Sequence, residues 1–142
     1  MRKSDYHLFQ LARECSFKSD YNGAGRAKIG CVIVYKGTVL AKGWNSDKTH
    51  TQQKQFNIWR YKDCGNRYLP EKTHSEIMAL TKIKYLDIDF SKVHIYIYRE
   101  YKNGKLAMCR PCPSCMAAIR SMNIKHLHYT TEEGYASEEL IY

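Results

Sequence analysis

The sequence contains few residues that break regular structure, and it has no long apolar run. Among 142 residues only 3 are proline and 8 are glycine, whereas 44% are hydrophobic. This composition excludes a disordered chain and predicts a buried core. No apolar stretch approaches the roughly 20 residues that a membrane-spanning helix requires. Near the N-terminus the apolar residues are interrupted by Gln10 and Arg13, which is not the pattern of a secretory signal, so we expect a cytoplasmic protein with no membrane association.

The sequence is also poor in acidic residues. It has 14 Asp and Glu against 23 Lys and Arg, a formal net charge of +9. The acidic tail that begins at Glu132 contains four glutamates and neither lysine nor arginine, so residues 1–131 carry 23 basic and 10 acidic side chains, a balance of +13. This balance indicates an anionic partner, either a phosphorylated small molecule or a nucleic acid, although solubility alone would also explain it.

Hydrophobic patterning predicts alternating helices and strands. Apolar spacing and the position of Pro113 predict helices over 6–17, 73–86 and 113–122. Runs rich in β-branched and aromatic residues predict strands over 29–35, 38–44, 93–98 and 125–130, and a further hairpin joins 98–101 to 106–108. The strand–helix–strand order over 93–130 implies a parallel, right-handed crossover. Together these elements predict an α/β fold, a three-layer α/β/α sandwich with a mixed sheet of about five strands.

No repeat or linker divides the chain, so we expect a single domain over 1–142. Within it, residues 46–72 form a basic and aromatic insertion. In residues 48–72, six Lys and Arg are accompanied by only two acidic residues, Asp63 and Glu71, and Phe56, Trp59, Tyr61 and Tyr68 lie among them. Aromatic residues beside basic ones are how unpaired nucleic-acid strands are held. A lid over the site or a contact between subunits would have the same composition.

Two short motifs, each at the start of a predicted helix, contain chemically distinctive residues: His74-Ser75-Glu76 and Pro111-Cys112-Pro113-Ser114-Cys115. A catalytic zinc takes three protein ligands and keeps a fourth position for water, and one histidine with two cysteines supplies those three. The partial positive charge of a helix N-terminus favours thiolate over thiol. Glu76 lies two residues beyond His74, so it points to a different side and can approach the water without being a ligand.

Each motif alone has a simpler explanation. Thr73 to Glu76 also matches a capping box, and Cys-x-x-Cys occurs in redox pairs and structural zinc fingers. H-x-E followed by P-C-x-x-C, with one strand between them, is the signature of zinc deaminases. Cys109 extends the cysteine run, so a ligand set in which it replaces Cys115 is conceivable, although Pro111 favours Cys112 and Cys115. His50 and Cys64 are too few for a second metal.

On these motifs the chain resembles the cytidine/deoxycytidylate deaminase superfamily, over nearly its whole length. The resemblance implies that His74, Cys112 and Cys115 bind one catalytic zinc ion and that Glu76 transfers protons. Gly43-Trp44-Asn45 fits the family's Gly-x-Asn, which implies that Asn45 contacts the substrate; an ordinary turn is the alternative. Members are commonly dimers or larger, so the resemblance allows a homo-oligomer.

The implied reaction is hydrolysis of cytosine to uracil with release of ammonia. Ser75 stands where the family usually has alanine, and we count it with Arg26, Lys28 and Arg110 as a candidate substrate-binding residue. The basic residues favour a free nucleotide such as dCMP, because they could hold a phosphate. Cytosine in single-stranded DNA or RNA is the main alternative, and adenosine in tRNA ranks lower. A structural zinc module that binds nucleic acid without catalysis is the non-enzymatic alternative.

Overall fold

The computed structural model describes residues 2–19, 28–46, 56 and 74–141. In chain order the elements are α1 (Lys3–Ser16), β1 (Ile29–Tyr35), β2 (Thr38–Trp44), α4 (Ser75–Thr81), the 3₁₀ helix η1 (Phe90–Lys92), β3 (Val93–Arg99), α5 (Pro113–Ser121), β4 (His126–Thr131) and β5 (Gly134–Glu139). Most of the predicted insertion lies outside the described residues, as does Arg26. In the part of the chain that the structure describes, no helix is long and apolar enough to cross a membrane.

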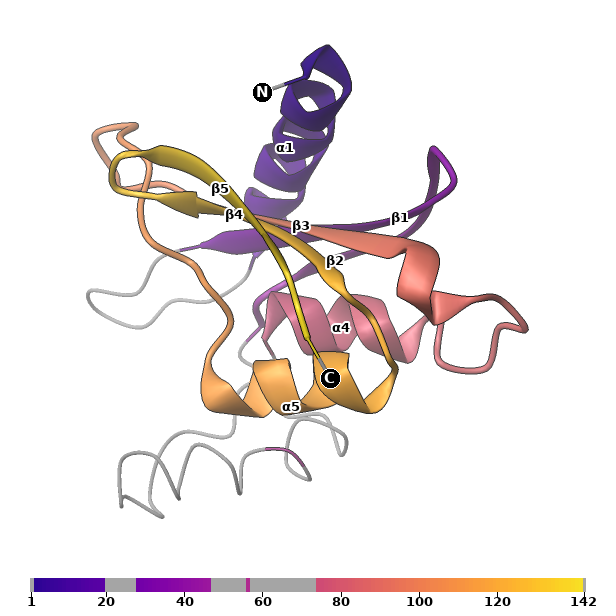
Figure 1. Cartoon of the computed structure of the whole chain (residues 1–142). Coiled ribbons are helices and arrows are strands. Elements are labelled where there is room, and N and C mark those ends of the chain that lie inside the picture. The colour runs from indigo at the N-terminus through magenta and orange to yellow at the C-terminus, as the bar shows by residue number, and fades with distance from the viewer. Residues whose placement is uncertain (1, 20–27, 47–55, 57–73, 142) are drawn as a thin grey trace.

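A five-stranded mixed sheet in the order β2-β1-β3-β4-β5 divides the molecule. β3 and β4 run parallel through the α5 crossover, as the sequence predicts, and the other neighbouring strands are antiparallel. Helix α1 covers one face of the sheet, and α4 and α5 cover the other (Figure 1). The predicted three-layer α/β/α sandwich is confirmed.

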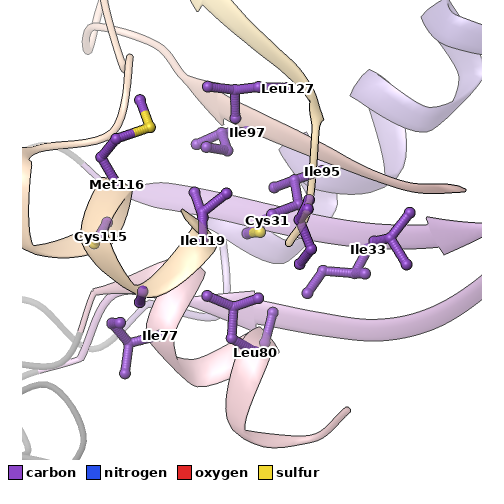
Figure 2. Close-up of a cluster of buried hydrophobic side chains, with 14 of the residues drawn as sticks. Cys31, Ile33, Ile77, Leu80, Ile95, Ile97, Cys115, Met116, Ile119 and Leu127 are labelled. Atoms are coloured by element: carbon purple, nitrogen blue, oxygen red, sulfur yellow. The ribbon is translucent and has the colours of Figure 1, made fainter. Parts of the chain in front are cut away.

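Strand β1 contributes to both hydrophobic layers, which explains its continuous apolar sequence. Cys31 and Ile33 face α4 and α5, where Figure 2 shows them near Leu80 and other apolar side chains of the larger core. Val32 and Val34 face α1 and belong to the smaller core. A strand buried on both faces has no polar alternation.

Two glycines allow helices to pack directly on strand backbones. A Cβ atom at Gly30 would lie 1.9 Å from the Ala12 carbonyl oxygen of α1. A Cβ atom at Gly43 would lie 2.3 Å from the Ser75 carbonyl oxygen, in the first turn of α4. No real Cβ fits at such distances, so the start of α4 rests against β2 only because residue 43 has no side chain.

Two predicted elements, the second helix and the hairpin after β3, differ from the structure. Helix α4 ends at Thr81 instead of 86, because the Lys82 and Ile83 amides donate to carbonyls three residues back, a tighter winding than the α-helix. The predicted hairpin after β3 is reduced to one bridge between Glu100 and Leu106. The polar side chain of Thr130 binds the Ala107 carbonyl (2.7 Å), so the segment that leaves the bridge is held by β4.

The acidic tail includes the fifth strand. β5 pairs with β4 along its whole length, and Leu140 beyond it is buried in the larger core. Glu138 holds Arg110 through two hydrogen bonds of 3.1 and 2.9 Å and accepts a third from the Tyr129 hydroxyl (2.9 Å). The tail therefore packs on the basic body of the protein, next to the loop that leads into α5.

Candidate active site and metal centre

The two helices below the sheet begin side by side, and each presents a motif at its start (Figure 1). His74 is the N-cap of α4, with extended backbone, and Cys112 is the extended N-cap of α5. Pro113 occupies the first helical position of α5, where its fixed φ and missing amide are tolerated. Cys115 follows in the first turn. The sequence thus sets where both helices begin, and the helix starts position the three side chains.

These three side chains converge on one point. The His74 Nδ1 atom lies 3.2 Å from the Cys115 sulfur and 3.5 Å from the Cys112 sulfur. The ligand atoms of all three lie within 4.8 Å of one another, and no other such group occurs among the described residues. One imidazole and two sulfurs are a donor set that suits zinc and leaves a coordination position for water. His74, Cys112 and Cys115 therefore form the predicted zinc-binding triad.

Cys109 lies elsewhere. Its sulfur lies 3.4 Å from the Ile97 carbonyl oxygen and 3.1 Å from the Thr130 hydroxyl, in the core under the sheet. Burial raises the pKa of this thiol to about 12, so it stays protonated at neutral pH. The alternative ligand set that includes Cys109 is not the one that the structure forms.

The electrostatics of the triad favour a cation. A hydrogen bond from Cys115 lowers the pKa of Cys112 to about 3, and His74 and the Ser114 hydroxyl, 3.0 Å from the Cys112 sulfur, add to this effect. Burial raises the pKa of Cys115, so this thiol keeps its proton until a metal displaces it. Binding of a dication to the triad requires both cysteines as thiolates, so zinc affinity should rise with pH.

Glu76 lies beside the triad and is not part of it. Its side chain is only 5% exposed, and one carboxylate oxygen accepts a hydrogen bond from the Ser75 hydroxyl. The carboxylate also lies within hydrogen-bond reach of the Cys115 thiol, where it contributes to the raised pKa of that group. The capping-box alternative does not describe α4, whose N-cap is His74 and makes no side-chain cap hydrogen bond. Glu76 is therefore a buried carboxylate directed at the metal centre.

The candidate substrate-binding residues lie in different surroundings. Asn45 is buried where β2 ends, and its Oδ1 accepts from the Ile29 amide (2.9 Å), which fixes the orientation of the side chain. Lys28 is exposed just before β1. Arg110 pairs with Glu138, and Ser75 is completely buried. Arg26 lies outside the described residues.

Two contacts near the centre were not anticipated from the sequence. The sequence indicates Ser114 only as a spacer between the two cysteines, whereas the residue is fully buried and its hydroxyl lies 3.0 Å from the Cys112 sulfur. Its position between the two cysteine ligands is the sequence feature that could have indicated a contact with one of them. Glu138 reaches Arg110 only through the pairing of β5 with β4, and no local sequence feature indicates that contact.

Comparison with known proteins supports the same assignment. Residues 2–131 match the family described as the cytidine and deoxycytidylate deaminase zinc-binding region. The fold is similar to that of the dCMP deaminase from the cyanophage S-TIM5, with 22% identity, a TM-score of 0.59, and coverage of 91% of this chain and 84% of that one. It is also similar to the cytidine deaminase from Burkholderia pseudomallei, with 16% identity, a TM-score of 0.63, and coverage of 98% and 93%. No curated protein matches significantly.

The family match covers most of the chain and includes both motifs, whereas structural likeness at these identities establishes the fold. In this chain the His/Cys/Cys triad lies at two helix starts beneath a five-stranded mixed sheet, and such a zinc-binding triad is typical of that family. The chain belongs to the cytidine and deoxycytidylate deaminase family of zinc-dependent hydrolases.

Proposed function

We propose that this protein converts cytosine to uracil and ammonia in a free cytidine or deoxycytidine nucleotide such as dCMP. The observation that carries the proposal is the buried Glu76 carboxylate beside the zinc triad. A buried carboxylate next to a metal centre costs free energy unless it has a partner or a task.

The reaction assigns a separate task to each group. Zinc held by the triad would polarise a water molecule and lower its pKa. Glu76 takes a proton from the attacking water, whose oxygen bonds to C4 of the base, and passes this proton to N3. Glu76 then delivers the second proton of the water to the exocyclic amine, the C4–N bond breaks, and ammonia leaves. General acid–base catalysis of this kind contributes roughly 10²–10⁴-fold to the rate.

The surrounding residues would hold the nucleotide. Because Asn45 Oδ1 is bound to the Ile29 amide, a contact of Asn45 with the substrate would use its amide nitrogen. Lys28, Arg26 and Arg110 remain our candidates for the phosphate. The bidentate pair of Arg110 with Glu138 has the fork geometry that also suits a phosphate, so a nucleotide would compete with Glu138 for this guanidinium. A protein of the same fold has been solved with dCMP and dUMP, which supports a nucleotide.

One observation favours cytosine in single-stranded nucleic acid as a second candidate. Trp44 directly precedes Asn45, and the Lys18 and Lys82 ammonium groups lie 5.3 and 5.2 Å from its ring centroid. An aromatic ring with lysines around it, on a chain of net charge +9, resembles the sites that hold unpaired strands.

Ammonia release from four substrates tests the proposal: dCMP, CMP, cytidine and a short cytosine-containing DNA strand. We expect release from a free nucleotide, fastest with dCMP. Ammonia release from the oligonucleotide alone, with a rate that depends strongly on salt concentration, would favour cytosine in single-stranded nucleic acid as the substrate. A zinc-loaded protein that releases no ammonia from any of the four would contradict the proposal.

A further inference from the structure

We infer that Ser75 is a positioning residue that holds one oxygen of the Glu76 carboxylate, so that the other oxygen, Oε2, moves the protons. The inference rests on the proposed function of Glu76 and adds a role that the substrate-binding prediction for Ser75 did not include. It depends on one contact, on the burial of both side chains, and on the rigid support behind Ser75.

The contact is a hydrogen bond inside the protein. The Ser75 hydroxyl donates to Glu76 Oε1, and the two side chains are 0% and 5% exposed. Successive side chains on a helix do not normally face each other, so this bond specifies one arrangement of the Glu76 side chain at the start of α4.

Because Ser75 is fully buried, its hydroxyl is better placed to hold Glu76 than to contact a substrate. A hydroxyl with no exposure must find its partner inside the protein, because an unpaired buried polar group costs free energy. Among the residues that the structure describes, the hydrogen bond recorded for this hydroxyl goes to Glu76. The Ser75 hydroxyl therefore supplies a hydrogen-bond donor to the Glu76 carboxylate, and the carboxylate supplies the acceptor that the buried hydroxyl needs.

The support behind Ser75 makes the anchor rigid. The Ser75 carbonyl oxygen lies 2.3 Å from where a Cβ of Gly43 would be, so the first turn of α4 is pressed against the backbone of β2. The Trp44 amide also donates to the Met78 sulfur (3.4 Å), one turn further along α4. The position of Glu76 is therefore fixed relative to β2, the strand that ends next to Asn45.

Holding one oxygen matters for a group that shuttles protons. A carboxylate with both oxygens loose rotates, and each rotation moves the reacting oxygen away from the water, N3 and the amine. With Oε1 bound to Ser75, Oε2 keeps one orientation throughout the reaction. Loss of the hydroxyl should therefore slow turnover and leave ground-state binding unchanged.

The test compares Ser75→Ala with Ser16→Ala as a matched control. Ser16 is also a buried helical serine, 2% exposed, but its hydroxyl donates to the Arg13 carbonyl on the opposite face of the sheet. We measure zinc content, kcat and KM with the best of the four substrates, and crystal structures of wild type and Ser75→Ala. We expect full zinc in all proteins, a kcat about tenfold lower with unchanged KM in Ser75→Ala only, and a Glu76 carboxylate that is rotated or split between orientations.

A decrease in kcat of less than about threefold, a decrease matched by Ser16→Ala, or an unmoved Glu76 carboxylate would overturn the inference. Loss of zinc in Ser75→Ala would also overturn it, because the serine would then support the metal and not the carboxylate. If the wild-type protein deaminates none of the substrates, the proposed function fails, and the two crystal structures alone decide whether Ser75 holds Glu76.

Discussion

The contact between β2 and α4 allows a sharp prediction for Gly43→Ala. The added methyl carbon would lie 2.3 Å from the Ser75 carbonyl oxygen and 2.8 Å from the Ala79 nitrogen. Both are backbone atoms, so rotation of a side chain cannot relieve the overlap. An ordinary contact needs at least 3.4 Å, so the start of α4 must move by about 1 Å. Overpacking typically costs about 1–3 kcal/mol, and rigid backbone neighbours favour the upper part of this range.

The same turn carries His74 and Glu76, so Gly43→Ala should also reduce zinc affinity and kcat. A displacement of about 1 Å at a catalytic group lowers the rate by roughly 10²-fold. Urea unfolding of the zinc-loaded protein, a competition assay for zinc, and ammonia release measure these effects. Gly104→Asn is the control, because a Cβ there meets no atom within 4 Å and asparagine is among the side chains least strained at a positive φ such as its 85°; its stability should fall by less than that of Gly43→Ala. Wild-type stability and kcat in Gly43→Ala would refute the close packing of α4 on β2.

Three further predictions concern the metal, the histidines and the tail. Chelation of zinc should lower the melting temperature by about 10 °C, because a ligand at a thousand times its Kd adds about 4 kcal/mol; an unchanged melting curve would contradict this. Burial lowers the pKa of His94 and lowers that of His128 to about 4, so folding favours the neutral form of both histidines. Stability should therefore be full above pH 6.5 and fall toward pH 4, and urea titrations of His128→Gln should show a weaker fall. Glu138→Gln should lower KM for dCMP but not for cytidine, because Arg110 is released for the phosphate; equal KM changes for both would exclude that role.

The zinc site could be predicted from the sequence because each part of it is local. His74 and Glu76 lie in one motif and both cysteine ligands in another, and the capping position and Pro113 set where the helices begin. The hairpin of β1 and β2 was predicted to the residue, since Lys36 and Gly37 adopt the positive φ values of 48° and 81° that a tight hairpin turn needs.

What could not be predicted depends on contacts between distant segments. Ile83 remains fully buried after α4 has ended, so helical apolar spacing continued past the true end of the helix. β5 has the sequence of an exposed edge strand, with Glu138 and Glu139 in place of apolar alternation, and only pairing with β4 makes it a strand. The bond from Ser75 to Glu76 depends on the packing of α4 against Gly43, which lies about thirty residues earlier.

The central claim is that Glu76 moves the protons and takes no part in holding the metal. Zinc stoichiometry and turnover measured on one preparation of Glu76→Gln test it most directly, with the exposed Glu133→Gln as the matched control. We expect one zinc per chain in both variants, turnover lowered by roughly 10²–10⁴-fold or more in Glu76→Gln, and wild-type turnover in Glu133→Gln. Glu76→Gln that binds one zinc and deaminates at close to the wild-type rate would contradict it.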